Sequence, residues 1–277
     1  MTPTQSRPSP IEDRSIMLVV RSILFNILFY LTLLVLMVFG LPMMLGGRRG
    51  VFALAGAWRI ASVWLLDRIC GLRVEYRGIG NIPPGAVLIA AKHQSFLETF
   101  ALLKYAPDFA IILKRQLTYI PVFGLYLVAS KQIAIDRARG RQALQQIGQA
   151  AEPVLAAGRQ IFIYPEGTRR PPGAPPKYKA GVAAIYAANT APCLPVAVNT
   201  GLFWRRRGFL RRPGVAVIEY LPPIPPGLDR ETFAARLQSE IESACDRLNA
   251  EAVARDPSLE AVIDEGANCD RLDKASA

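Results

Sequence analysis

The chain has 277 residues, is 51% hydrophobic and carries a formal net charge of +11. This composition is too apolar for a disordered protein, and the length suits one large domain, or one and a half, with a buried core. Four scattered cysteines without a C-x-x-C pair argue against a zinc site or a disulfide framework, and the single histidine means that any histidine-dependent catalysis uses His93.

The excess positive charge lies in the first 220 residues. Residues 221–277 hold 6 basic and 12 acidic groups, whereas residues 1–220 hold 27 basic and 10 acidic groups. A basic region of this kind attracts nucleic acid, anionic lipid or a phosphorylated substrate, and composition does not choose among them. We expect residues 256–277 to form an acidic, flexible tail.

The N-terminal region is dominated by one long apolar run. Residues 1–15 are polar, and we expect a flexible lead-in there. From Ile16 to Leu45 the chain is almost wholly apolar, and its uncharged part is long enough to cross a bilayer core of about 30 Å. A cleaved signal peptide would have a shorter apolar stretch, and a helix pair buried in a soluble core would not need so long a run.

A second apolar segment, residues 51–70, is amphipathic. Its tryptophans Trp58 and Trp64 and its two arginines are typical of a membrane interface. Arginines flank the first run on both sides, so the positive-inside rule does not predict its orientation. A re-entrant helix pair, which enters the membrane and leaves it on the same side, is at least as compatible with the sequence as a transmembrane helix. We therefore predict membrane-associated helices in residues 16–70.

Beyond residue 70, short β-prone runs alternate with helix-like stretches. The runs are 72–78, 86–92, 109–114, 131–135, 161–165, 193–198 and 215–220, and the helical stretches are 96–105, 140–157, 179–188 and 230–254. This alternation predicts an α/β domain over residues 71–255, with a mixed, largely parallel sheet of about seven strands flanked by helices.

The histidine directly follows the predicted strand 86–92 and precedes Glu98 by five residues. On one continuous helix two such side chains would lie about 140° apart and could not meet. They meet if His93 lies in the loop and Glu98 in the first helical turn, and the capping-box spacing of Ser95 and Glu98 predicts that a helix starts near Phe96. The carboxylate would then hold one ring nitrogen and leave the other free to take a proton from a hydroxyl. Alternatively, Ser95 and Glu98 only cap the helix.

Two further predicted strands end next to cations. Glu166, Gly167, Thr168 and Arg169 follow the run 161–165, and Lys114 and Arg115 end the run 109–114. Arginine binds phosphate through two parallel hydrogen bonds. One base and several cations at strand ends fit an enzyme whose substrate carries both a hydroxyl and a phosphate.

Four blocks in this order carry a resemblance to a known family. They are His93 to Glu98, Lys114-Arg115 with Ile120-Pro121-Val122-Phe123-Gly124, Pro165 to Arg169, and Leu194-Pro195-Val196-Ala197. They resemble the motifs of the glycerolipid acyltransferases, most closely the bacterial 1-acyl-sn-glycerol-3-phosphate acyltransferases. The one departure is Glu98, which stands where the family has aspartate, and either carboxylate can orient an imidazole.

The resemblance implies a reaction in which a fatty acyl group moves from a thioester donor, acyl-CoA or acyl carrier protein, to the sn-2 hydroxyl of lysophosphatidate and forms phosphatidate. His93 would act as the base and Glu98 would hold it. Arg169, Lys114 and, more weakly, Arg115 would bind the acceptor's phosphate. The reaction needs no metal, no bound cofactor and no nucleic acid.

The remaining expectations also come from the resemblance. Glu166 would brace Arg169 or a glycerol hydroxyl, and Gly167 and Thr168 would also contact the substrate. Backbone amides near Ile120 and Pro121, or near Gly167, are candidates for holding the oxyanion. The enzyme would contact membrane lipid at the bacterial inner membrane, with its catalytic domain on the cytoplasmic side.

Several alternatives remain open on the sequence alone. Another acceptor, such as a lyso-aminolipid or glycerol 3-phosphate, would use the same motifs. A membrane esterase would need a G-x-S-x-G nucleophile elbow, which the chain lacks, and a basic binding module would not need the four ordered blocks. The arginines at 205–207 and 211–212 form a solvated loop, a contact with anionic lipid, or a docking site for the acyl donor.

Overall fold

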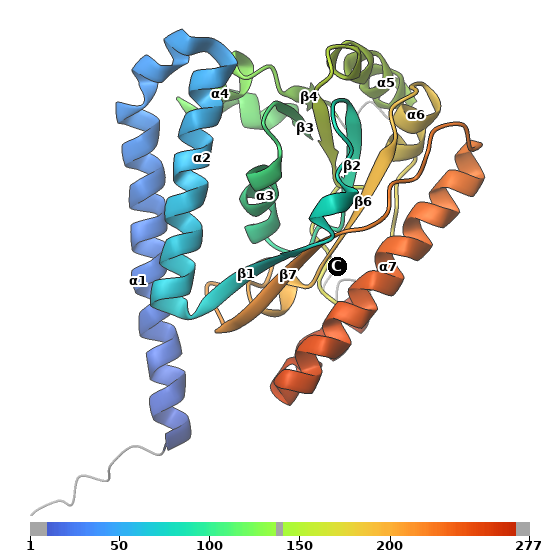
Figure 1. Ribbon diagram of the computed structural model, residues 1–277. Helices are drawn as coiled ribbons and strands as arrows, with labels where there is room; N and C mark the ends of the chain where they lie inside the picture. Colours follow the sequence, from blue (N-terminus) through green and yellow to red (C-terminus); the bar gives the residue numbers. More distant parts are fainter. Residues whose placement is uncertain (1–9, 137–140, 270–277) are drawn as a thin grey trace, which may run out of the picture.

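The computed structural model describes residues 10–136 and 141–269, and a seven-stranded sheet forms its centre (Figure 1). The strand order is β1-β7-β6-β2-β5-β3-β4, with β6, β2, β5, β3 and β4 mutually parallel, β7 antiparallel to β6, and β1 parallel to β7. The strands are β1 (Leu72–Arg77), β2 (Val87–Ala91), β3 (Phe109–Lys114), β4 (Ile133–Ile135), β5 (Gln160–Ile163), β6 (Cys193–Val198) and β7 (Gly214–Tyr220). The predicted mixed, largely parallel sheet is confirmed.

Helices cover both faces of the sheet. One face carries α1 (Pro10–Phe39), η1 (Leu41–Gly46), α2 (Gly47–Leu65), η2 (Leu66–Cys70), α3 (Leu97–Ala101) and η4 (Leu102–Tyr105), and the other carries α5 (Arg141–Ala156), α6 (Gly181–Ala187) and α7 (Arg230–Arg255). The shorter elements are η3 (Ile79–Asn81), η5 (Arg115–Tyr119), α4 (Phe123–Ala129), η7 (Thr200–Leu202), η8 (Pro257–Leu259) and α8 (Glu260–Ala267). Two apolar cores, one on each face, result from the near-complete burial of the central strands.

The N-terminal helices form a hairpin, and their boundaries differ from the sequence-based expectation. The first helix already begins at Pro10, inside the segment expected to be a lead-in, and it ends at Phe39, so the long apolar run is divided by the turn at η1. Gly40 and Pro42 account for this break, because neither favours continuation of a helix. Residues 1–9 lie outside the described part of the chain.

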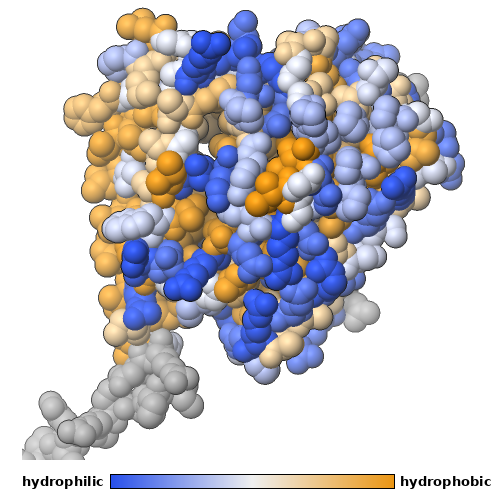
Figure 2. All heavy atoms as spheres, in the orientation of Figure 1, coloured by the Kyte–Doolittle hydropathy of each residue, from blue (hydrophilic) through white to orange (hydrophobic). Residues whose placement is uncertain are grey.

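The hairpin is both a part of the fold and an exposed apolar surface. Two segments, Ser15–Phe39 and Leu41–Cys70, are long and apolar enough to cross a membrane, and only 17% and 28% of their apolar 18-residue windows are buried. Figure 2 shows hydrophobic side chains along the hairpin. An exposed apolar patch of this size marks an interaction surface, and its helices favour association with a membrane.

The buried face of the hairpin packs on an aromatic cluster. Phe29 lies 5.3–6.0 Å, between ring centroids, from Trp58, Phe96, Phe100 and Trp204. Since Phe96 lies three residues after His93, this cluster joins the hairpin directly to the histidine loop. Aromatic pairs in such tilted and edge-to-face geometries each add about 0.5–1.5 kcal/mol beyond area burial.

A buried arginine fastens the loop after Trp204 to the first helix. Arg211 is 4% exposed, its Nη2 donates to Asn26 Oδ1 at 2.8 Å, its backbone N–H donates to Ser22 Oγ at 2.9 Å, and its guanidinium lies 3.9 Å from the Trp204 ring centroid. Burial lowers the pKa of this guanidinium to about 10. The polar residues within α1 therefore mark its docking face, and Arg211 is not part of a solvated cluster.

The C-terminal segment is folded rather than a flexible tail. Residues 257–267 form η8 and α8, and Leu259 and Val262 are buried in the core. A Cβ on Gly266 would lie 1.8 Å from the carbonyl oxygen of Pro172, so α8 packs closely on the loop that follows Arg169. This packing supports the loop from outside the 71–255 domain that the sequence predicted, and residues 270–277 lie outside the described part.

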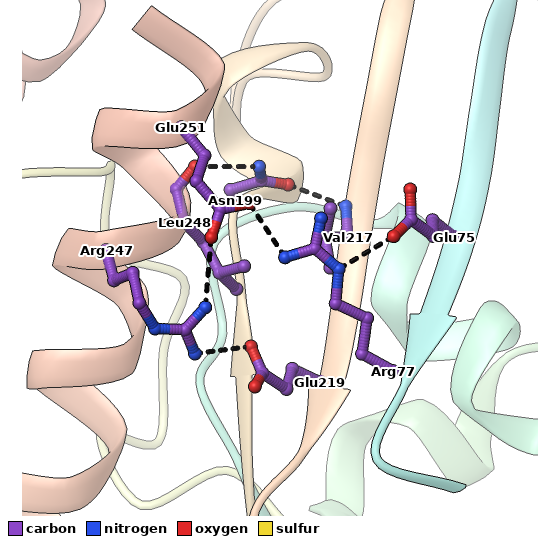
Figure 3. A network of polar contacts seen from close by, with 8 residues as sticks. All are labelled: Glu75, Arg77, Asn199, Val217, Glu219, Arg247, Leu248 and Glu251. Atoms are coloured by element: carbon purple, nitrogen blue, oxygen red, sulfur yellow. Dashed lines mark hydrogen bonds and ion pairs between the residues drawn. The ribbon is translucent and has the colours of Figure 1, made fainter. Parts of the chain in front are cut away.

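A polar network joins α7 to the sheet (Figure 3). Arg77 on β1 pairs with Glu251 at 2.7 Å, and Arg247 pairs with Glu219 on β7 at 2.7 Å. Asn199 donates to the carbonyl oxygen of Leu248 and accepts from the backbone N–H of Val217. Asn199 is thereby fixed between α7 and β7, and the next residue, Thr200, belongs to the site described below.

Substitution of Arg211 tests whether its hydrogen bonds hold α1 against the sheet domain. We expect Arg211→Gln to lower the free energy of unfolding by about 2 kcal/mol, because buried hydrogen bonds of the guanidinium are lost. Arg207→Gln, at an exposed position in the same loop, should change it by less than about 0.5 kcal/mol. Denaturation in a neutral detergent measures both, and equal stability of the two variants would contradict the docking.

Candidate active site

The carboxyl ends of the parallel strands place the candidate residues along one edge of the sheet. His93 follows β2, Tyr164 follows β5, Lys114 ends β3, and Asn199 follows β6. In an open α/β sheet, ligands bind outside this edge because the loops there come from several strands. We call it the catalytic edge.

His93 and Glu98 form a hydrogen-bonded pair on this edge. The ring Nδ1 lies 2.8 Å from Glu98 Oε1, the Glu98 side chain is fully buried, and the His93 side chain is 14% exposed. Glu98 Oε1 also accepts the backbone N–H groups of Gln94 and Ser95, at 2.8 and 2.7 Å. The expected pairing of a loop histidine with a carboxylate in the first turn of the next helix is confirmed.

The surroundings of Glu98 determine the tautomer of the histidine. Thr200 Oγ1 donates to the second carboxylate oxygen, Oε2, at 2.7 Å, so both oxygens accept hydrogen bonds. An ionised carboxylate has no proton to donate, so Nδ1 of His93 carries the hydrogen and Nε2 is left with its lone pair. A neutral imidazole held in this way can accept a proton from a hydroxyl at Nε2.

The helix start explains why the pair forms from sequence neighbours. The Ser95 N–H donates to Glu98 Oε1, and the Leu97 N–H donates to Ser95 Oγ at 3.1 Å. These two bonds satisfy backbone donors that a helix N-terminus otherwise leaves unpaired. The capping interaction and the histidine contact therefore coexist on the same carboxylate, so Glu98 does not only cap the helix.

Three further side chains support the pair and were not identified from the sequence. Tyr164 stacks on the His93 ring, with centroids 3.9 Å apart, and burial raises the pKa of its phenol, which stays neutral. Thr200 fixes Glu98, and Gln94 accepts the N–H of Gly201 at 3.1 Å. They come from three different loops. Gln94 lies within the first block and Tyr164 directly precedes the Pro-Glu-Gly-Thr-Arg block, whereas Thr200 had no nearby sequence signal.

The loop Pro165 to Arg169 meets the histidine loop through its last residues. The backbone N–H of Arg170 donates to the carbonyl oxygen of His93 at 2.8 Å. The Arg169 guanidinium lies 5.3 Å from the centroid of the Phe96 ring, a cation–π distance, and it is partly exposed. His93, Glu98 and Arg169 are thus brought together, while Thr168 lies exposed beside them.

Glu166 does not share this arrangement. Its carboxylate is buried and lies 3.2 Å from Lys92 Nζ, which in turn binds Glu242 of α7 at 2.7 Å. Burial disfavours the charge on Lys92, but the two carboxylates outweigh it and raise the pKa of the ammonium. Glu166 therefore faces α7, on the opposite side of the sheet from α3. The arginine within 4 Å of its carboxylate is Arg170, at 3.8 Å, rather than the expected Arg169, and a contact with a glycerol hydroxyl stays a prediction.

The expectation for Gly167 also changes. Its backbone N–H donates to the Tyr164 carbonyl oxygen at 2.8 Å and closes the turn after β5. Because this N–H group already donates a backbone hydrogen bond, we do not assign it to binding the oxyanion. The role of Gly167 is to shape the turn that carries Arg169.

Lys114 and Arg115 lie further along the catalytic edge. Strand β5 separates β3 from β2, which puts the end of β3 about 10 Å from that of β2. Lys114 is exposed and Arg115 partly exposed. The cations of β3 and the loop after β5 therefore flank the edge at different distances from the histidine.

The turn after η5 is tight and strained. Val122 has φ 63° and ψ −55°, and the Phe123 N–H donates to the Pro121 carbonyl oxygen at 2.7 Å, which together define a γ-turn that is rare for a β-branched residue. A Cβ on Gly124 would lie 2.0 Å from the carbonyl oxygen of Thr118, so no larger residue fits. Steric need thus explains the Gly of the second block.

The described residues do not form a cluster of metal-ligating side chains. Within residues 10–136 and 141–269, no three His, Cys, Asp or Glu side chains lie close enough together to hold an ion.

Comparison with known proteins agrees with this arrangement. Residues 73–199, which include all four blocks, match the family model described as Acyltransferase. The chain is 34% identical over 197 residues to a 1-acyl-sn-glycerol-3-phosphate acyltransferase of Pseudomonas aeruginosa, covering 71% of this chain and 75% of that one. The chain belongs to this acyltransferase family.

More distant members of the family and a solved structure are also similar. The 1-acyl-sn-glycerol-3-phosphate acyltransferase alpha of Mus musculus is 27% identical over 158 residues, covering 56% of this chain and 55% of that one. The crystal structure of the 1-acyl-sn-glycerophosphate (LPA) acyltransferase PlsC from Thermotoga maritima superposes with a TM-score of 0.69 at 21% identity, covering 84% of this chain and 98% of that chain. At that identity the match shows the shared fold.

The contact between Thr200 and Glu98 yields a prediction. We expect Thr200→Val to lower kcat about tenfold with little change in KM, because one buried hydrogen bond to the carboxylate is lost and the histidine is held less firmly. Thr200→Ser keeps the hydroxyl and should retain most of the activity. Steady-state kinetics of both variants measure this effect, and an unchanged kcat for Thr200→Val would contradict the positioning role.

Proposed function

We propose that this enzyme transfers a fatty acyl group from a thioester donor to the sn-2 hydroxyl of lysophosphatidate and forms phosphatidate. The observation that carries the proposal is the His93–Glu98 pair, which engages Nδ1 and leaves the lone pair of Nε2 available on a side chain that is 14% exposed. Membership of the acyltransferase family and the name of the Pseudomonas relative support the choice of substrate.

The chemistry follows from this geometry. The acceptor hydroxyl attacks the thioester carbonyl while Nε2 of His93 takes its proton, and the imidazolium is stabilised by Glu98. The tetrahedral intermediate then collapses with cleavage of the C–S bond, and the leaving thiolate takes the proton back from His93. No acyl-enzyme forms, because the attacking oxygen belongs to the substrate.

The acceptor's phosphate would bind to the cations of the catalytic edge. Arg169 is our first choice, because its loop is hydrogen-bonded to the histidine loop. Lys114 and Arg115 flank the same edge from β3 and would bind the phosphate or the donor's carrier. The phosphate and the hydroxyl of one lysophosphatidate are only a few bonds apart, which favours Arg169 as the phosphate ligand. The β3 cations lie further from His93 and would suit a group further from the reacting hydroxyl, such as the donor's carrier.

The acyl chains of the substrates would account for the exposed apolar surface of the hairpin. Acceptor and product are amphiphiles, and moving a chain into water costs about 0.8 kcal/mol per CH₂. The exposed apolar side chains of α1 and α2, together with Tyr119, Leu125 and Val128, would place the catalytic edge at a lipid surface. We propose a location at the bacterial inner membrane, with the sheet domain on the cytoplasmic side where the thioester donors are made.

The acyl donor would be acyl-CoA or acyl carrier protein. Of the five arginines of the 205–212 loop, Arg211 is buried and Arg205 pairs with Glu265 at 2.8 Å. Arg206 and Arg207 are exposed and Arg212 is partly exposed, and these three side chains would meet an acidic carrier or the phosphates of coenzyme A. The two donors are distinguished by comparing rates with each one.

The proposal is tested by a thioester-dependent acylation assay in detergent, with lysophosphatidate, glycerol 3-phosphate and a lyso-aminolipid as acceptors. We expect phosphatidate to be the main product and His93→Ala to lose about 10²–10⁴-fold in kcat, because a general base contributes that much. Glu98→Asp should retain activity and Glu98→Gln should lose it.

The fold of each variant is checked by its unfolding temperature. Undiminished turnover in folded His93→Ala would reject the mechanism, and a preference for another acceptor would redirect the substrate assignment while leaving the mechanism in place.

A further inference from the structure

A pocket lies away from the catalytic edge. It has a volume of about 690 Å³ and lies between α2 and the segment Leu103–Phe109, which connects η4 to the amino end of β3. Lys114, on the catalytic edge, is at the other end of the same strand. Figure 2 shows a hollow between the hydrophobic hairpin and the sheet domain, with hydrophilic side chains around it.

The pocket is lined by an excess of positive charge. Its lining includes Arg48, Arg49, Arg59 and Lys104 against one carboxylate, Asp108. That carboxylate is already paired with Arg48 at 3.1 Å and with Arg159, outside the pocket, at 2.7 Å. Like charges gathered in a recess without counter-ions repel one another, and an anion would relieve the repulsion.

Three of the cations remain available for such an anion. Within the described ranges, Arg49, Arg59 and Lys104 form no ion pair with a carboxylate. Arg49 and Lys104 are exposed, and Lys104 Nζ lies 4.5 and 5.1 Å from the ring centroids of Tyr76 and Tyr105. The two aromatic rings hold the ammonium at the pocket rim through cation–π contacts.

The other wall of the pocket belongs to the apolar hairpin. Phe52 and Gly56 of α2 line it, and Leu45 and Ile60 of the same hairpin are 92% and 60% exposed. A volume of this size is within the usual range for small-molecule sites. Cations in a recess beside an exposed apolar surface match a molecule with a phosphate at one end and acyl chains at the other.

We infer that this pocket binds the phosphate of an anionic phospholipid headgroup, with the acyl chains lying along the hairpin. The site is separate from the acceptor site, since it lies at the amino ends of the parallel strands. A bound headgroup would bridge α2 to Lys104 of η4, which directly continues the helix that carries Glu98. The lipid would thus fasten the hairpin to the support of the catalytic pair.

Hydrogen exchange of the full chain in neutral detergent tests the inference. The probes are dihexanoyl phosphatidylglycerol, dihexanoyl phosphatidylcholine and inorganic phosphate, each titrated separately. We expect phosphatidylglycerol to protect peptides that span residues 48–59 and 103–109 from exchange. Phosphatidylcholine should need at least a tenfold higher concentration for the same protection. Inorganic phosphate should need a higher concentration still, because it lacks the acyl chains.

The variant Arg49→Gln/Lys104→Gln should raise the half-saturating concentration of phosphatidylglycerol about tenfold at these peptides. The control Arg73→Gln/Arg236→Gln removes the same charge from exposed positions outside the pocket lining and should change it less than twofold. Equal weakening by the control, or no weakening by the pocket variant, would overturn the site. Equal protection by inorganic phosphate would support a phosphate site but overturn its assignment to lipid.

Discussion

A single buried carboxylate organises the candidate active site. Glu98 accepts the histidine, two backbone N–H groups and the hydroxyl of Thr200 at once. Because each of these donors comes from a different point of two loops, the carboxylate fixes the loops relative to one another as well as the imidazole. The network around Asn199 extends this support, because Asn199 joins the start of the loop that carries Thr200 to α7 and β7 (Figure 3).

The membrane hairpin is joined to the same centre. Phe29 packs on Phe96, which precedes α3, and on Phe100 within α3, the helix that carries Glu98, and Arg211 fastens the loop after Trp204 to α1. A tether that only held the enzyme near a bilayer would need no such packing. We infer that the hairpin sets the orientation of the catalytic edge relative to lipid, so that an acyl chain can reach His93 without crossing water.

Much of this was accessible from the sequence, for physical reasons. Every predicted strand run overlaps an observed strand. The central runs were the clearest, because the central strands of a parallel sheet are buried on both faces and their sequences are continuous apolar segments. The pairing of His93 with Glu98 followed from local capping geometry. Thr200 and Glu166 could not be placed, because which way a side chain points after a strand depends on loop packing. The fold of the C-terminal segment could not be predicted either. Its composition is mainly acidic, and the few apolar residues that pack into the core, such as Leu259 and Val262, do not form a recognisable pattern.

The most direct test uses the fact that the chain has one histidine. Protein labelled with ¹⁵N-histidine gives one imidazole, whose two nitrogen shifts report which of them carries the proton. At pH 8.5 in neutral detergent, we predict the Nδ1–H form in the wild type, with the proton shared toward Glu98, and a loss of this preference in Glu98→Gln. An Nε2–H form in the wild type, or identical spectra for the two proteins, would contradict the account.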